Sequence, residues 1–447
     1  MEYMGIKIDL ERDKLFDILG IKRLQESYMK EGETSPQQRF AFVSKSFGSN
    51  DDHAQRLYEY SSKHWLSYST PILSFGRSKR GMPISCFLNY IEDTAEGLVE
   101  NFSETAWLSM FGGGVGIGIG IRSAGNKSTG AMAHLKTYDA SSLAYRQGST
   151  RRGSYAAYLN ISHPDIISFI EMRKPTGDQN VRCLNLHHGI NITDDFMQII
   201  ENCMVDPLAN DDWELKDPHS GEVREVISAK MLWQMIVEGG RMQTGEPYMH
   251  FIDTSNRHLP QWLKDAGLQV RQSNLCSEIT LPTNEERTAV CCLSSLNLET
   301  YDEWKDDKLF LKDVAEMLDN VLQFFIDNAP DTISRAKFSA SRERSIGIGA
   351  LGFHAYLQRK GIAFEGVMAK ITNNKIFSSI RKSLDEANLQ LGSERGEAPD
   401  IQSKIVFECD DGNTVEFNSS DTVTVVRNGE TMLIRACAVL EGDDLKV

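Results

Sequence analysis

Apolar residues recur at helical spacing over the first 65 residues and then give way to alternating strand and helix patterns. Residues 10–30 and 51–65 have the spacing of amphipathic helices, and Asp51 and Asp52 are placed to cap the second one. From about Ser67, short apolar runs typical of buried strands occur at 84–88, 115–121, 155–161 and 181–186. Amphipathic stretches predict helices at 94–111, 194–204, 229–242 and 311–325, and two more at 346–361 and 371–395. This alternation predicts an α/β barrel or a doubly wound sheet.

The pattern changes again near residue 401. Short strand-like runs follow at 405–408, 415–417, 423–426 and 432–435. The pairs Asp411-Gly412 and Asn428-Gly429 lie between them and are hairpin turn signals. Acidic residues outnumber basic ones in this segment. We therefore expect a helical region at 1–66, a main α/β domain at 67–400 and a small acidic β module at 401–447.

Charge and cysteine usage narrow the class of protein. The net charge of −15 argues against nucleic-acid binding, which needs clustered Lys and Arg. No apolar run is long enough to predict a membrane span, and residues 1–12 are too charged for a secretion signal. The eight cysteines have no compact spacing framework, so we expect a cytoplasmic protein whose functional thiols act in chemistry.

Three further patterns favour structural readings. The glycine-rich run at 111–120 contains no G-x-G-x-x-G window, and Asn126 breaks a near match to a phosphate loop. We interpret the run as a strand or turn that another backbone approaches closely. His187 and His188 would face opposite sides of a strand, and Cys291-Cys292 lacks the partner pair of a zinc site. No metal site is predicted.

The segment most informative about chemistry is RQSNLCSEITLP, at 271–282. In an extended chain, Asn274, Cys276 and Glu278 would project from one face. A carboxylate can take a proton from a hydroxyl group, an amide can orient that group, and a thiol can exchange hydrogen or act as a nucleophile. Spacing alone is also compatible with a strand that carries incidental polar residues.

This segment resembles the active-site finger loop, N-x-C-x-E, of class I ribonucleotide reductase large (catalytic) subunits. Other segments resemble the family in the same order along about residues 36–400: 69–72 (STPI), Ser85-Cys86, 112–120 with Arg122, 146–153 (RQGSTRRG), and Cys291 with 294–298 (SSLNL). The resemblance implies an incomplete reductase-type α/β barrel. It also implies an enzyme of deoxyribonucleotide biosynthesis for DNA replication.

By this resemblance, Cys276 becomes a thiyl radical that abstracts the 3'-hydrogen of a ribonucleotide. Glu278 takes the 3'-hydroxyl proton and Asn274 holds the ribose hydroxyl groups. Cys86 and Cys291 supply the dithiol that becomes a disulfide as the 2'-hydroxyl leaves as water. Since neighbouring strand residues face opposite ways, Cys291 rather than Cys292 is expected to face Cys86.

The resemblance also implies binding residues. Thr70, Ser85 and Gly114 would line the substrate site. Asp93 and Arg122 would bind a deoxynucleotide effector. Gln147 and Arg151 would relay the identity of that effector to the substrate base.

The cofactors and partners follow from the same family. The chain itself would bind no cofactor. A diiron-type small subunit would supply the radical, and thioredoxin or glutaredoxin would supply the external dithiol. ATP or deoxynucleotides would act as allosteric effectors. The assembled large subunit is expected to be an oligomer.

Three departures from the family shape the expected assembly, one being that the strand-like segment from about Ile401 resembles nothing in the reductase. Only about 65 residues precede Ser67, so we expect no N-terminal ATP cone. Beyond Pro399, the remaining barrel strands, phosphate loop, radical-relay tyrosines and cysteine pair do not follow. We therefore expect the N-terminal fragment of a split phage-type enzyme in a host cytoplasm, completed by a second large-subunit fragment that residues 401–447 help to dock.

Two alternatives remain open at this point. A cobalamin-dependent reductase shares the finger loop and both redox thiols. An inactive effector-binding scaffold would need none of the thiols, and its function would be indifferent to Cys276→Ser. The residues do not separate diphosphate from triphosphate substrates.

Overall fold

The computed structural model describes residues 1–79, 81–125, 128–145 and 153–400, together with strand segments after residue 400. Those segments are β13 (Lys404–Glu408), β14 (Thr414–Asn418), β15 (Thr422–Arg427), β16 (Glu430–Arg435) and β17 (Asp444–Lys446). Gln147 and Arg151 therefore lie outside the described residues.

The chain begins with a two-stranded hairpin, β1 (Glu2–Tyr3) and β2 (Ile6–Lys7), followed by helices. The helix expected at 10–30 is divided into a 3-10 turn at Leu10–Leu15 and α1 (Ile18–Ser27), because Asp17 caps a new helix by accepting from the Gly20 amide. Ser35 and Gln38 form a capping box at the start of α2 (Pro36–Phe47). Asn50, rather than the predicted Asp51 and Asp52, caps α3 (Asp51–Ser62).

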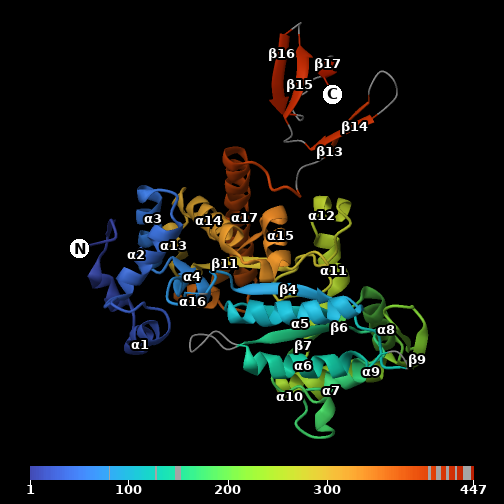
Figure 1. Ribbon diagram of the computed structural model, residues 1–447. Helices are drawn as coiled ribbons and strands as arrows, with labels where there is room; N and C mark the ends of the chain where they lie inside the picture. The colour runs from blue at the N-terminus through green and yellow to red at the C-terminus, as the bar shows by residue number, and fades with distance from the viewer. Residues whose placement is uncertain are drawn as a thin grey trace.

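An eight-stranded sheet forms half of a barrel (Figure 1). Its strand order is β10-β7-β6-β5-β4-β11-β12, and β3 pairs with β11 at one end of that strand. Strands β4, β5, β6, β7 and β10 run parallel to one another, whereas β11 is antiparallel to β4 and parallel to β12. Their bounds are β3 (Leu66–Tyr68), β4 (Cys86–Ile91), β5 (Gly114–Ile119), β6 (Tyr155–Asn160), β7 (His187–Ile192), β10 (Tyr248–Phe251), β11 (Ala289–Asn297) and β12 (Ile346–Leu351).

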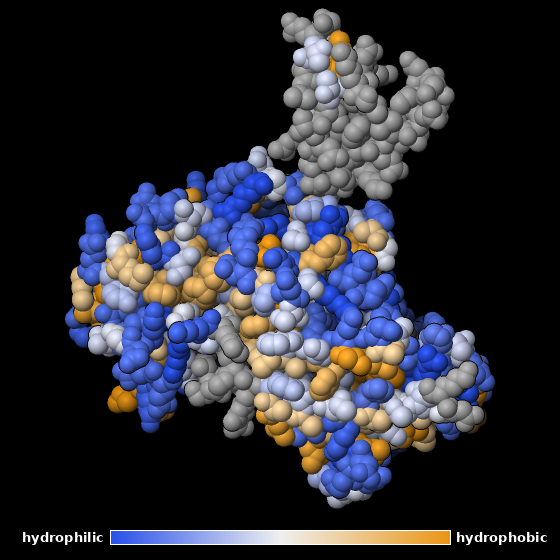
Figure 2. All heavy atoms as spheres, viewed as in Figure 1, coloured by the Kyte–Doolittle hydropathy of each residue, from blue (hydrophilic) through white to orange (hydrophobic). Residues whose placement is uncertain are grey.

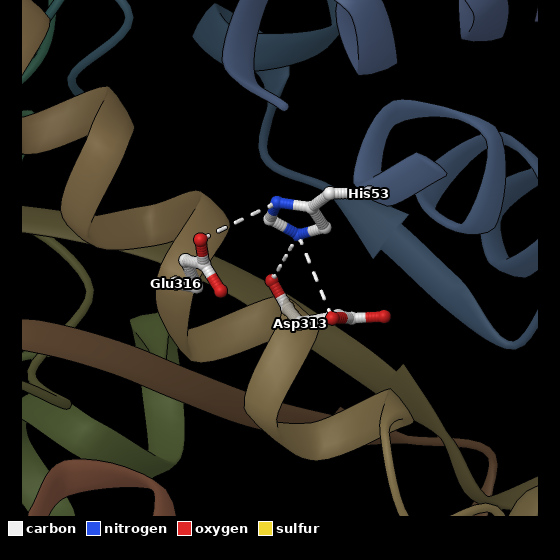
Figure 3. Close-up of side chains that lie close together, drawn as sticks. All are labelled: His53, Asp313 and Glu316. Carbon is white, nitrogen blue, oxygen red and sulfur yellow. Dashed lines mark hydrogen bonds and ion pairs between the residues drawn. The ribbon is translucent and has the colours of Figure 1, made fainter. Parts of the chain in front are cut away.

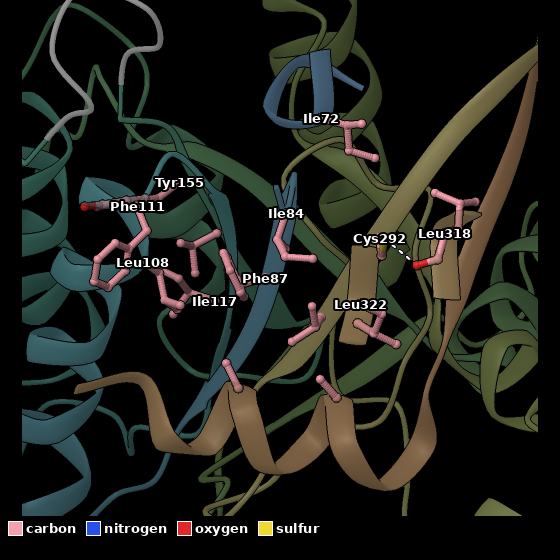
Figure 4. Close-up of a cluster of buried hydrophobic side chains, with 14 of the residues drawn as sticks. Ile72, Ile84, Phe87, Leu108, Phe111, Ile117, Tyr155, Cys292, Leu318 and Leu322 are labelled. Carbon is pink, nitrogen blue, oxygen red and sulfur yellow. Dashed lines mark hydrogen bonds between the residues drawn. The ribbon is translucent and has the colours of Figure 1, made fainter. Parts of the chain in front are cut away.

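Helices connect and cover these strands. They are α4 (Thr70–Leu73), α5 (Ala95–Met110), α6 (Ala131–Ala144), α7 (Ile166–Glu171), α8 (Asp194–Val205), α9 (Ala229–Ile236), α10 (Met242–Thr244), α11 (Ile252–His258), α12 (Gln261–Asp265), α13 (Tyr301–Trp304), α14 (Phe310–Asn328), α15 (Ser334–Glu343), α16 (Phe353–Arg359) and α17 (Val367–Arg395). A hairpin of β8 (Asp212–Lys216) and β9 (Val223–Ser228) follows α8. One large apolar core joins the outer face of the sheet to the helices, with Phe87, Leu108, Ile117 and Leu322 fully buried (Figure 4).

Two predicted elements were wrong. The strand expected at 181–186 begins instead at His187, and the residues just before it form a 3-10 turn at Gln179–Val181. The helix expected at 346–361 starts as β12 and becomes helical only at Phe353. Ile346, Ile348 and Leu351 fit either period, and pairing with β11 selects the strand.

The last strands match the short runs expected there. β13 pairs with β14, and β15 lies between β16 and β17, all antiparallel. β17 was not predicted. Hydrophilic residues cover most of the visible face of the molecule, as the acidic composition indicates (Figure 2). None of the described helices is both long and apolar enough to cross a bilayer.

Candidate active site

Glycines of β5 make room for a loop that crosses the inner face of the half-barrel. A Cβ on Gly116 would lie 2.1 Å from the Ser273 carbonyl oxygen and 2.6 Å from the Asn274 Cα. A Cβ on Gly118 would lie 2.5 Å from Oε1 of Gln272, and one on Gly114 would lie 2.6 Å from the Leu275 side chain. The glycine-rich run is therefore a strand that another backbone approaches closely, as expected from the sequence.

Hydrogen bonds with β4, β6 and β7 hold this loop at its start. Tyr158 donates a hydrogen bond of 2.6 Å to the Asn274 carbonyl. The Gln272 amide donates to the Asn89 carbonyl at 2.7 Å, and the Asn191 amide donates to the Arg271 carbonyl at 2.8 Å. Sequence reasoning missed these anchors, because no local signal connects them to the loop.

The tip of the loop is a tight turn rather than the extended segment expected from the sequence. Oδ1 of Asn274 accepts from the amides of Glu278 and Ile279 at 2.9 and 3.0 Å. Ser277 has a φ of 68°, in the left-handed region. Asn274 is fully buried, whereas Cys276 and Glu278 are exposed, so the three side chains do not share one face by strand alternation.

Three cysteine thiols meet at this tip. The register of β11 on β4 places Cys291 directly opposite Cys86. A side-chain hydrogen bond with Cys276, burial and the neighbouring Cys291 together raise the pKa of Cys86 well above its ordinary value. Burial, followed by the nearby charges of Glu278 and Cys276, raises the pKa of Cys291 to about 12. Both buried thiols therefore keep their S–H hydrogen at neutral pH.

Cys292 points away from this cluster. Its thiol donates to the Leu318 carbonyl of α14 at 3.4 Å, within the apolar core (Figure 4). Burial raises its pKa well above the ordinary value. Neighbouring strand residues face opposite sides, so only Cys291 can face Cys86.

Several buried polar atoms near the start of β4 have no partner among the described residues. They include Oγ of Ser69 and Oγ of Ser85; Nδ2 of Asn274 likewise has no oxygen or nitrogen acceptor. Burying a polar atom without a partner is costly, so such atoms are free to bind a polar ligand. Thr70, at the start of α4, contacts the Tyr28 hydroxyl at 3.4 Å.

The predicted effector residues meet at the opposite ends of β4 and β5 from the thiols. Arg122 donates from Nε to the carboxylate of Asp93, forming a salt bridge. Gln147 and Arg151 remain untested because their segment lies outside the described residues.

A group of His53, Asp313 and Glu316 lies apart from the thiols, between α3 and α14 (Figure 3). Their possible ligand atoms are already hydrogen-bonded: Nδ1 of His53 accepts from the Ser49 amide at 3.1 Å, and Nε2 contacts the Asp313 carbonyl at 3.0 Å. Arg56 binds the Asp313 carboxylate with two bonds of 2.6 and 2.9 Å. The group therefore fastens the N-terminal helices to α14.

Comparisons with known proteins agree with this geometry. Residues 84–426 match the family described as ribonucleotide reductase, barrel domain, and residues 14–81 match its all-alpha domain. The barrel match thus extends into the segment that the sequence pattern separates at residue 401. The chain is 52% identical over 443 residues to the ribonucleoside-diphosphate reductase large subunit of Invertebrate iridescent virus 3, covering 88% of this chain and 70% of that protein.

Other relatives give the same assignment. Identity is 50% over 361 residues to the putative large subunit of Frog virus 3, covering 80% of this chain and 62% of that protein. The solved class Id ribonucleotide reductase alpha subunit of Actinobacillus ureae has a TM-score of 0.73 and 29% identity, covering 88% of this chain and 70% of that one. The chain spans only part of the length of each relative. It belongs to the ribonucleotide reductase large-subunit family, as the resemblance of its finger loop predicted.

Proposed function

We propose that this chain reduces ribonucleoside diphosphates to deoxyribonucleotides by thiyl-radical chemistry at Cys276. The observation that carries the proposal is the meeting of three thiols: an exposed one at the tip of a buried loop, and two that face each other on adjacent antiparallel strands. The family membership and the relatives' names support the reaction class.

In this mechanism the Cys276 thiyl radical takes the 3'-hydrogen, which forms S–H on Cys276 and leaves a radical at C3'. Glu278 accepts the 3'-hydroxyl proton, and the Asn274 amide, whose Nδ2 has no oxygen or nitrogen acceptor among the described residues, holds the ribose hydroxyls. The 2'-hydroxyl leaves as water after protonation by the Cys86–Cys291 pair. The pair loses two electrons and two protons and becomes a disulfide: one hydrogen leaves in the water, the other is transferred to C2', and Glu278 returns its proton to the 3'-oxygen. Cys276 then returns its hydrogen to C3' and is again a radical.

The raised pKa values of Cys86 and Cys291 support their role as hydrogen donors. A dithiol that donates hydrogen must carry its protons before turnover, and burial keeps them on Cys86 and Cys291. A diiron-type small subunit would generate the radical, and an external dithiol such as thioredoxin would reduce the disulfide. Class I membership supports a separate small subunit.

We further propose that a second large-subunit fragment completes the barrel. Among the described residues, β12 pairs only with β11, and its ends Ile346 and Leu351 are exposed. Exposed apolar side chains gather at the start of α17: Val367, Met368 and Ile371 on the helix, and Phe364 in the connection that precedes it. Unpaired strand edges and exposed apolar side chains favour association.

The segment 401–447 would dock this fragment. It leaves the body at a fixed point, because Arg287 and Arg342 bind the buried carboxylate of Asp400. Tethering of this kind raises the effective local concentration of two partners. Deleting residues 403–447 should weaken co-purification of the fragment and lower turnover. Equal assembly of the shortened chain would remove the docking role, and turnover by residues 1–447 alone would remove the need for a fragment.

The chemistry is tested by Cys276→Ser in the assembled enzyme. Turnover should be abolished, because an alcohol O–H is a far poorer hydrogen-atom relay than a thiol. Cys203→Ser, on α8, is the control and should retain turnover. Activity in the Cys276→Ser enzyme would exclude the proposed radical site.

A further inference from the structure

A histidine lies on the same inner wall as the finger loop. Gly116 of β5, Ala156 of β6 and His187 of β7 are register neighbours, so their side chains face the same side of the sheet. Adjacent strands are about 4.8 Å apart, which places His187 roughly 10 Å from Gly116, where Asn274 packs. That separation is comparable to the span of one nucleoside.

A carboxylate orients the imidazole of His187. Nδ1 lies 2.6 Å from Oε1 of Glu246, and the other carboxylate oxygen accepts from the amide of His188 at 3.2 Å and lies 3.3 Å from Arg173. Burial raises the pKa of Glu246, but hydrogen bonds from His187 and His188 and attraction to Arg173 lower it overall. Glu246 is therefore an anion that accepts a hydrogen bond from Nδ1–H. Nε2 of the half-exposed ring has no hydrogen bond among the described residues, and in the neutral ring with its hydrogen on Nδ1 this atom is an acceptor.

Tyr248 of β10 continues this wall beyond β7, at the end of the sheet opposite β4. Its ring and that of His187 are parallel within 9°, with centroids 6.5 Å apart. Tyr248 is the register partner of Gly189, which lies two residues after His187 on β7, so the side chains of Tyr248 and His187 face the same inner side of the sheet. The unpartnered hydroxyls belong to Ser85, just before β4, and Ser69, just after β3; both strands lie on the other side of β5 from His187. The inner wall thus carries hydroxyls on its β4 side and aromatic rings on its β10 side.

We propose that His187 and Tyr248 contact the nucleobase of the substrate, with Glu246 as a positioning residue. The inference rests on the proposed function, which seats the ribose at Cys276 and Asn274. The hydroxyl-lined side suits the phosphates, and the aromatic side suits a planar base through stacking and one edge hydrogen bond. Nε2 of His187 accepts from the amino group at C4 of cytosine or C6 of adenine, where uracil and guanine carry a carbonyl, so it favours cytosine and adenine over uracil and guanine. Strand β6, which lies between β5 and β7, begins just after the 146–153 segment that is expected to relay effector identity.

The test measures kcat and KM for CDP, UDP, ADP and GDP in the assembled enzyme. Tyr248→Leu should raise KM on the order of tenfold for all four substrates, because stacking does not depend on the base. Tyr248→Phe should restore the wild-type KM. His187→Ala should raise KM on the order of tenfold more for CDP and ADP than for UDP and GDP, with kcat changed far less. Glu246→Gln should shift the same ratio in the same direction.

The control is His258→Ala on α11, which should change neither parameter. Unchanged KM values in both His187→Ala and Tyr248→Leu would overturn the inference, as would an equal fall in kcat for all bases at constant KM. If the wild-type assembly shows no turnover, the proposed function fails. Calorimetric binding of the four diphosphates then decides the inference: weaker binding by Tyr248→Leu supports it, and equal binding overturns it.

Discussion

Replacing Gly116 by alanine should displace the finger loop. The new methyl group would meet the Ser273 carbonyl oxygen at 2.1 Å, the Asn274 Cα at 2.6 Å and the Asn274 carbonyl carbon at 2.9 Å. Ordinary contacts begin near 3.4 Å, so the loop backbone must retreat by more than an ångström. All three atoms belong to backbone, and the hydrogen bond from Tyr158 to the Asn274 carbonyl resists that retreat.

The Gly116→Ala substitution should lower both the stability of the fold and the turnover of the enzyme. Overpacking of a dense interior destabilises by about 1–3 kcal/mol, which urea unfolding can resolve. A misplacement of about 1 Å at a reacting group lowers turnover by about a hundredfold. Gly114→Ala should cost less on both measures, because its nearest contact is the flexible end of the Leu275 side chain.

Gly392→Ala in α17 is the matched control. No atom lies within 4 Å of its added methyl group, so helix propensity should leave stability unchanged or increase it by up to about 1 kcal/mol. The assay compares urea midpoints and turnover of the three variants with the wild type. If Gly116→Ala matched Gly392→Ala in both, the close packing of the loop on β5 would not control the active site.

Three further outcomes can be checked. A single turnover without external reductant should give a Cys86–Cys291 disulfide by peptide mass mapping, with Cys292 still a free thiol; Cys292→Ser should retain turnover and Cys291→Ser should lose it. Burial raises the pKa of Glu343 to about 7 from an unfolded value near 4.5. The free energy of unfolding should therefore fall by about 3 kcal/mol as the pH rises between these two values. Glu343→Gln should remove this pH dependence of stability, whereas Glu397→Gln, at an exposed site, should not. If the pH dependence persisted in Glu343→Gln, other groups would be its cause. Arg122→Gln should break the pair with Asp93 and reduce the effect of deoxynucleotides on base choice while leaving unstimulated turnover; unchanged effector response would exclude this pair from the effector site.

The parts of the site that sequence reasoning captured are those encoded locally. The N-x-C-x-E string marks the loop, and the alternation of glycines in β5 indicates a close approach by another backbone. Strand parity also separates Cys291 from Cys292. The family relationship was then visible from the order of several such segments.

The parts that were missed depend on contacts between distant residues. Asn274 is held by Tyr158, which is 116 positions away, and Gln272 by Asn89, which is 183 positions away. The turn at Ser277 forms because the Asn274 side chain accepts two amides, which a rule of strand alternation does not include. The pattern of residues 346–351 fits a helix as well as a strand, and only pairing with β11 distinguishes the two.

The long sequence separation between β5 and its loop also has a consequence for biosynthesis. On a ribosome, β4, β5 and β6 emerge more than a hundred residues before Asn274, so their inner wall is bare while translation continues. Glycines present little but peptide groups there, and water can hydrate these until the loop arrives. A wall of large apolar side chains would instead attract other nascent chains during that interval. The strip of glycines that receives the finger loop thus also limits aggregation before the catalytic thiol has been synthesised.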